Sequence, residues 1–184
     1  MWKTIAYLWF KINGWKIEGN IPPEVKKAVI TAAPHTSNWD FIHSRAAFFL
    51  MDKQVRFAIK KSFVDSPVGP LLRQLGAIAI DRSVAKKKIS MVDFMVDLYN
   101  KNEDLYIMIA PEGTRKYVEK WKTGFFHIAK NAKVPVIPGY LDYERKVAGV
   151  GPVIELSGNQ KEDIERIKSF YRPIPGKYPE KGVR

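Results

Sequence analysis

The residues that could do chemistry follow short apolar segments, and the clearest of them is a histidine. His35 lies in the stretch PHTSNWD (34–40), after the apolar run 28–33 and before a predicted helix. A carboxylate bonded to one imidazole nitrogen fixes the tautomer and stabilises the imidazolium, which leaves the other nitrogen free to take a proton from a hydroxyl. The spacing of His35 and Asp40 therefore indicates a general base and its supporting acid.

The same two residues also allow a structural interpretation. An acidic residue in the first turn of a helix stabilises that turn through the helix dipole, so Asp40 could serve the helix while His35 occupies a turn. The other two histidines, His43 and His127, fall within predicted helices. We interpret both of them as structural.

Two further motifs follow predicted strands. The loop PEGTR (111–115) contains Gly113, which permits an unusual backbone angle, and Arg115, whose planar fork can hold two phosphate oxygens. The segment 76–82 delivers Asp81 and Arg82 to the end of a strand, where α/β proteins place their sites. A polar turn with a surface arginine, or a structural Asp–Arg pair, would give the same patterns.

Strands and helices are expected to alternate along the chain. Apolar runs predict strands, and apolar residues at helical spacing predict helices. The strands are expected at 28–33, 55–59, 77–80, 105–110 and 134–140, and the helices at 2–13, 39–51, 67–75, 89–100, 123–131 and 162–170. This alternation predicts a single α/β domain whose mainly parallel sheet is flanked by helices on both faces.

Two regions receive more specific expectations. Pro135 and Pro138 indicate that the strand at 134–140 is an edge strand or that these prolines lie at its end, because proline cannot donate a hydrogen bond to a neighbouring strand. The segment 147–156 is expected to form a hairpin, and a basic, proline-rich tail ends the chain.

The N-terminal segment is expected to be an amphipathic helix. Its apolar stripe consists of Trp2, Ile5, Trp9 and Ile12, and it ends near Gly14. Tryptophan beside lysine suits the headgroup region of a membrane, whereas a helix packed on the protein's own core would show the same pattern. Lysines interrupt the segment, so we expect neither a spanning helix nor a cleaved signal peptide.

The composition narrows the classes of partner. Lys and Arg number 31 against 19 Asp and Glu, which gives a net charge of +12 and a field that attracts polyanions such as nucleic acid, anionic lipid or phosphorylated substrates. The absence of cysteine excludes disulfides, thiolate metal sites and thiol nucleophiles.

In their order and spacing, the motifs resemble four sequence blocks of the glycerolipid acyltransferase family, typified by the 1-acyl-glycerol-3-phosphate acyltransferases. His35 and Asp40 match the first block, and residues 111–115 match the third. The second block is matched by Lys60, Pro67, Gly69 and residues 76–82, and the fourth by VPVIP (134–138). The sequence departs from the common pattern at Pro34 and Ala110, where Asn and Phe often stand.

The resemblance implies that His35, supported by Asp40, deprotonates a lipid hydroxyl that attacks an acyl thioester. The donor would be acyl-CoA or acyl-carrier protein, and the acceptor a lysophospholipid such as 1-acyl-glycerol-3-phosphate. Without Cys or a Gly-x-Ser-x-Gly elbow, direct transfer is the simpler mechanism. The residues carried over as the acceptor-phosphate site are Arg82, Glu112, Gly113, Thr114 and Arg115.

On this basis residues 1–14 are expected to form a membrane-interface helix and residues 15–184 the acyltransferase domain. We expect peripheral attachment to an anionic membrane surface at its cytoplasmic face, no metal, no cofactor beyond the acyl donor, and no nucleic acid partner. Two alternatives stay open: an acyltransferase for a lyso-aminolipid of the lyso-ornithine type, and a non-catalytic basic module that binds membranes or nucleic acid.

Overall fold

The computed structural model describes residues 1–80 and 90–184, so Asp81, Arg82 and Ile89 lie outside the described residues. The strands are β1 (Lys16–Glu18), β2 (Lys27–Ala32), β3 (Val55–Lys60), β4 (Ala77–Ile80), β5 (Leu105–Ile109), β6 (Val136–Asp142) and β7 (Val147–Val150). The helices are α1 (Trp2–Asn13), α2 (Trp39–Leu50), α3 (Lys61–Val64), α4 (Gly69–Gln74), α5 (Met91–Lys101), α6 (Gly124–Ala132) and α7 (Gln160–Tyr171), with a 3₁₀ turn at Pro179–Lys181.

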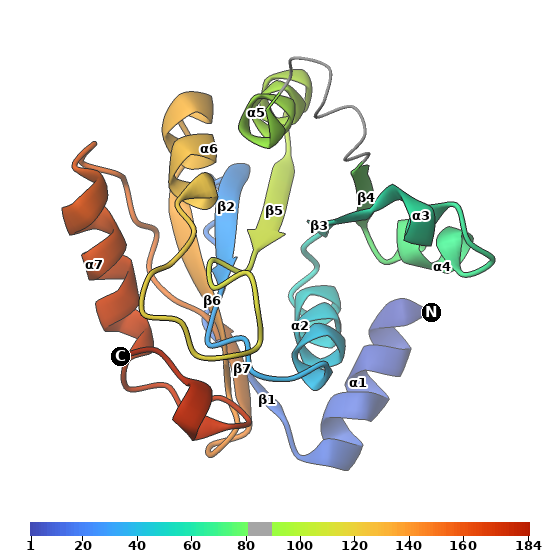
Figure 1. The fold of residues 1–184 in the computed structure, drawn as a ribbon. Coiled ribbons are helices and arrows are strands. Elements are labelled where there is room, and N and C mark those ends of the chain that lie inside the picture. The colour runs from blue at the N-terminus through green and yellow to red at the C-terminus, as the bar shows by residue number, and fades with distance from the viewer. Residues whose placement is uncertain (81–89) are drawn as a thin grey trace.

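The strands form one seven-stranded sheet in the order β1-β7-β6-β2-β5-β3-β4 (Figure 1). All neighbouring pairs are parallel except β6 and β7. The carboxyl ends of β2, β3, β4 and β5 therefore meet at one edge of the sheet. This edge carries the loops that begin at residues 33 and 110.

Helices cover both faces of the sheet. Successive residues of a strand point to opposite faces, so alternate residues of β2 pack into two different cores. Val29 of β2 packs into a core with residues of α5, α6 and α7, whereas Ala28 and Ile30 pack into a second core with Phe48 of α2. The expected α/β fold is confirmed.

The N-terminal helix packs on α2 rather than standing apart from the domain. Ala6 and Phe10 are buried in a cluster with residues of α2, and Gly14, at φ +72°, ends the helix. The expected apolar stripe is divided. Trp2 and Trp9 stack on Phe49 and Trp39, whereas Ile5 and Ile12 are 50% and 81% exposed.

Two local expectations need correction. The strand with Pro135 and Pro138 is β6, which lies inside the sheet between β7 and β2 and is not an edge strand. Pro135 lies directly before the first residue of β6, as the strand-end alternative expected. Pro138 is accommodated because β7 ends opposite Gly139 and the next bridge pairs Val136 with Ile154, so no ladder partner needs the missing N–H. The Pro138 carbonyl still accepts a hydrogen bond of 2.6 Å from the Gly151 N–H. The segment 147–156 is not a hairpin of its own, since β7 pairs with β6.

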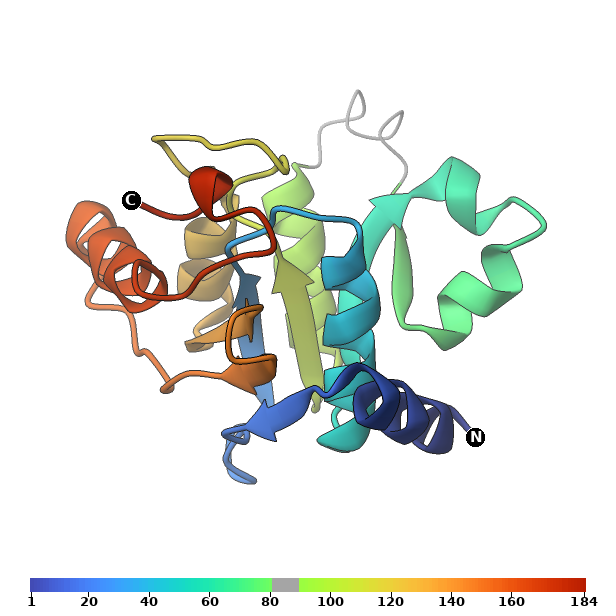
Figure 2. The ribbon, with the colours of Figure 1, turned by 90° about the horizontal axis from the view of Figure 1, so that it is seen from below.

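The C-terminal segment that follows α7 returns across the sheet to the loop between β2 and α2 (Figure 2). A Cβ added to Gly176 would lie 2.9 Å from Thr36, and the Tyr178 N–H donates to the Thr36 hydroxyl at 3.3 Å. None of the helices in the described ranges is long and apolar enough to cross a membrane.

Candidate active site

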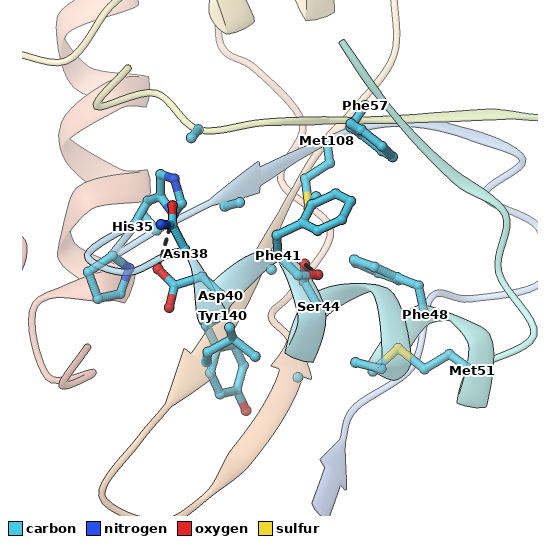
Figure 3. A pocket seen from close by; sticks show the side chains of 18 of the residues that line it. His35, Asn38, Asp40, Phe41, Ser44, Phe48, Met51, Phe57, Met108 and Tyr140 are labelled. Carbon is cyan, nitrogen blue, oxygen red and sulfur yellow. Dashed lines mark hydrogen bonds and ion pairs between the residues drawn. The ribbon is translucent and has the colours of Figure 1, made fainter. Parts of the chain in front are cut away.

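The loop between β2 and α2 folds back on the first turn of α2. His35 Nδ1 lies 3.0 Å from Asp40 Oδ2, and the backbone N–H groups of Thr36 and Ser37 donate to the same oxygen at 2.8 and 2.9 Å. With Nδ1 engaged, the imidazole presents Nε2 for other chemistry, and its side chain is 30% exposed. The hydrogen bond expected between His35 and Asp40 is present (Figure 3).

The second oxygen of Asp40 is held by a residue that the motifs did not indicate. The Tyr143 hydroxyl donates to Asp40 Oδ1 at 2.7 Å. Burial alone would raise the pKa of Asp40, but hydrogen bonds from His35, Tyr143 and the Ser37 backbone outweigh it and lower that pKa. Asp40 is therefore a carboxylate whose two oxygens are both fixed.

Glu112 connects the loop after β5, which carries residues 111–115, to the loop after β2, which carries His35. Its Oε2 accepts a hydrogen bond of 2.7 Å from the backbone N–H of His35. The side chain is buried, and burial raises the pKa of Glu112 to about 7, although the hydrogen bond from His35 acts in the opposite direction. Glu112 thus lies under the histidine loop, inside the protein.

A basic groove of about 440 Å³ lies beside the loop between β2 and α2. Arg115 donates to the side-chain oxygen of Asn38, and Thr114 also lines the groove. Lys116 and Lys181, which the motifs did not single out, add two further cations. The backbone of Gly113 has φ +64°, and a Cβ there would lie 2.7 Å from the side chain of Lys122.

The predicted phosphate residues are therefore partly brought together. Thr114 and Arg115 line the basic groove, Gly113 shapes the loop that carries them, and Glu112 lies beneath it. Arg82 falls outside the described residues.

His35 and Asp40 form a dyad, and an apolar cavity of about 310 Å³ opens beside it and extends between α2 and the sheet. Figure 3 shows His35 and Asp40 at one end of it and apolar side chains at the other. Those apolar side chains are Phe41, Phe48, Met51, Phe57 and Met108. A polar, proton-accepting group thus adjoins a space suited to a hydrocarbon chain.

The remaining histidines have different surroundings. His43 is buried on α2, stacks on Trp15 at a centroid distance of 4.2 Å, and accepts a hydrogen bond from Trp9 Nε1 at 3.2 Å. Burial lowers the pKa of His43 to about 4. His127 is exposed on α6.

The described ranges contain no group of three or more His, Asp or Glu side chains that could hold a metal ion.

Comparisons with known proteins converge on one family. A sequence model of the Acyltransferase family matches residues 15–142. The 1-acyl-sn-glycerol-3-phosphate acyltransferase of Haemophilus influenzae is 26% identical over 179 residues, covering 88% of this chain and 73% of that protein. The protein of the same name from Salmonella typhimurium is 33% identical over 131 residues, covering 68% of this chain and 52% of that protein.

The fold also has a counterpart among solved structures. The crystal structure of the 1-acyl-sn-glycerophosphate acyltransferase PlsC from Thermotoga maritima superposes with a TM-score of 0.64 at 16% identity. The alignment covers 92% of this chain and 76% of that one. At this identity the likeness is one of fold.

Proposed function

Because this chain belongs to the acyltransferase family, we propose that it transfers a fatty acyl chain from an acyl thioester to the hydroxyl of a lysophospholipid such as 1-acyl-glycerol-3-phosphate. The donor is acyl-CoA or acyl-carrier protein. One observation carries the proposal: His35, with Nδ1 bonded to Asp40, lies where the apolar cavity meets the loop that borders the basic groove.

The chemistry follows from the dyad. Nε2 of His35 takes the proton of the acceptor hydroxyl while the hydroxyl oxygen attacks the thioester carbonyl carbon. The tetrahedral intermediate then collapses, the carbon–sulfur bond breaks, and the leaving thiolate recovers the proton from His35. Asp40 stabilises the imidazolium between these steps, and Tyr143 and Glu112 position Asp40 and the histidine loop.

Each substrate has a matching surface. Burying a fatty acyl chain in the apolar cavity contributes about 0.8 kcal/mol per methylene group, which favours that space for the acyl chain. The groove with Arg115 offers charge-assisted hydrogen bonds to the acceptor phosphate. Arg82 stays a proposed ligand of the same phosphate, and the groove's cations favour a phosphate acceptor over a lyso-aminolipid.

We place the protein at an anionic membrane surface through α1. The exposed residues Ile5, Leu8 and Ile12 would enter the interface, while Ala6 and Phe10 hold the helix on the domain. An Ile5→Gln/Ile12→Gln variant should therefore lose vesicle binding and keep its melting temperature. The matched control is Phe10→Ala, which should lose stability instead.

The proposed function is tested by transfer of a radiolabelled acyl chain with purified protein. Both donors are compared on 1-acyl-glycerol-3-phosphate and on lyso-ornithine lipid. Labelled phosphatidate formed in preference to labelled ornithine lipid supports the proposal, whereas the reverse preference replaces the acceptor. No transfer to either lipid by protein that binds vesicles would favour the non-catalytic module.

A further inference from the structure

A second basic pocket, of about 370 Å³, lies at the opposite edge of the sheet from the dyad. It is formed where β3 and β4 begin, together with the end of α2, the first turn of α1, and α4. Figure 1 shows the N-terminal end of α1 near α4 on this side of the molecule. The basic residues that line the pocket are Lys3, Arg45, Lys53, Arg56 and Arg73, and Asp52 is acidic.

The positive charge of this pocket is only partly balanced. Lys3 pairs with Asp52 at 2.5 Å, and Arg73 lies 3.8 Å from Asp65 outside the pocket. Within residues 1–80 and 90–184, the other three cations, Arg45, Lys53 and Arg56, form no ion pair with a carboxylate. The pocket therefore has an excess of cations that an anion would neutralise.

Arg45 is the unusual member of this set because it is only 4% exposed. Its Nη1 donates to the Val55 carbonyl at 2.5 Å, and its guanidinium lies 5.0 Å from the Phe49 ring centroid, but its Nε has no hydrogen-bond partner in the described chain. Burial, with repulsion from Arg56, lowers the pKa of Arg45 to about 10. A buried cation without a counter-ion is costly, and a hydrophobic side chain of similar size would usually serve the core better.

The borders of the pocket indicate where its anion comes from. Two of the helices that contribute to its lining, α1 and α4, expose apolar side chains, namely Ile5 and Leu71. Phe63 is exposed on α3, which packs on α4. A cluster of guanidinium and ammonium groups suits a phosphate. Exposed apolar side chains on these helices suit a phosphate whose molecule continues into hydrocarbon, since they would enter the same interface.

We propose that this pocket binds the phosphate of an anionic phospholipid headgroup, and that Arg45 is its buried cation. The proposal rests on the peripheral membrane attachment in the proposed function. It adds a defined lipid contact at the far edge of the sheet from His35.

The test uses sedimentation with phosphatidylcholine vesicles that contain phosphatidylglycerol, in the absence of donor and acceptor. Arg56→Gln removes an exposed pocket cation, and Lys11→Gln removes an exposed cation of α1 outside the pocket. At low salt we expect losses of roughly tenfold or more for Arg56→Gln and about fivefold for Lys11→Gln. At about 1 M salt the loss for Lys11→Gln should disappear while most of the loss for Arg56→Gln persists, because diffuse attraction is screened first.

A second variant separates binding from structure. Arg45→Met should lose vesicle binding roughly tenfold while its melting temperature changes little, because removing a buried cation without a counter-ion offsets the loss of the hydrogen bond to the Val55 carbonyl. A lower melting temperature with unchanged vesicle binding would make Arg45 a purely structural residue and overturn the proposal. Equal losses for Arg56→Gln and Lys11→Gln at both salt concentrations would also overturn it.

A third measurement distinguishes the lipid from free phosphate. If sodium phosphate raises the melting temperature of the wild type but not of Arg56→Gln, while vesicle binding of Arg56→Gln matches that of Lys11→Gln, the site takes soluble phosphate and the headgroup assignment fails. None of these measurements involves acyl transfer. A failed transfer assay would therefore refute the proposed function and leave the binding result standing.

Discussion

Two histidines near Asp40 lie in opposite surroundings. His35 is in a loop, partly exposed, with Nδ1 bonded to Asp40 and the cavity beside it. His43 is on α2, buried against Trp15, with Nδ1 accepting from Trp9. Both residues lie near the same carboxylate, yet only His35 combines that support with access to a substrate space.

The difference shows that the environment, rather than the residue type, decides which histidine can act as a base. A buried imidazole among aromatic rings stays neutral and packs like an aromatic residue, which is consistent with the pKa of His43 falling to about 4 because of burial. An imidazole whose Nδ1 is held by a carboxylate can accept a proton at Nε2.

The largest effect is expected for His35→Ala. Loss of a general base lowers turnover by about 10² to 10⁴-fold, and the melting temperature should stay near that of the wild type because His35 lies in a loop. Acyl transfer and thermal unfolding are measured on the same preparation. His43→Phe is the matched control and should keep its turnover; near wild-type turnover in His35→Ala would break the contrast.

The next effect is expected in the basic groove. Arg115→Ala should raise KM for 1-acyl-glycerol-3-phosphate by about tenfold or more and leave KM for the acyl donor nearly unchanged, because a charge-assisted contact to phosphate is lost. Arg115→Lys should recover part of the affinity. Equal changes for donor and acceptor would assign Arg115 to the fold or to the donor.

A smaller effect is expected for Tyr143→Phe. The substitution removes the hydrogen bond to Asp40 Oδ1, so the pKa of Asp40 should rise and turnover should fall by about tenfold or less. The loss should grow as pH falls, because a smaller share of Asp40 then stays ionised in the variant than in the wild type. Activity measured across pH tests this role, since a purely structural defect would lower the rate by the same factor throughout.

The smallest effect on activity is expected at His43, whose contribution lies in stability. Its folded pKa of about 4 is below the usual 6.5, so the unfolded chain binds more protons between these values and stability falls as pH drops from about 6.5 to 4. The change is at most about 3 kcal/mol. The raised pKa of Glu112 has the opposite effect on stability over much of this range.

The difference between the wild type and His43→Phe isolates the contribution of His43. Denaturant unfolding at several pH values should show the wild type gaining stability relative to His43→Phe as pH rises from about 4 to 6.5. A difference that does not depend on pH would mean that His43 keeps its proton affinity on folding. The contrast with His35 would then lose its physical basis.

Much of the fold could be predicted because local patterns carry it. Apolar runs bounded by turn residues placed β2 and β4 within a residue of their ends, and helical spacing of apolar residues indicated α1 and α5. The short helix α3 was missed because its four residues, KSFV, form too short a window for any periodicity. The interior place of β6 was missed because it depends on strand order, with β2 paired on one side of β6 and β7 on the other.

In the candidate site too, contacts between residues close in sequence could be predicted, and contacts between distant residues could not. The contact between His35 and Asp40 is local in sequence, and the spacing predicted it. Glu112 was expected at a phosphate, but it bonds to a backbone 77 residues away, and Tyr143 reaches Asp40 across 103 residues. Such contacts depend on strand order, and Tyr143 lies just beyond the residues that the family model matches.

The most direct test of His35 as the base is chemical rescue of His35→Ala by imidazole. The vacated position adjoins the cavity and is open to solvent, so a small base can reach it. We predict that the rate of acyl transfer rises with the concentration of neutral imidazole, and that wild type and His43→Phe show no such response. A rate in His35→Ala that stays independent of imidazole, while the acceptor still binds, would contradict a proton-accepting role for His35.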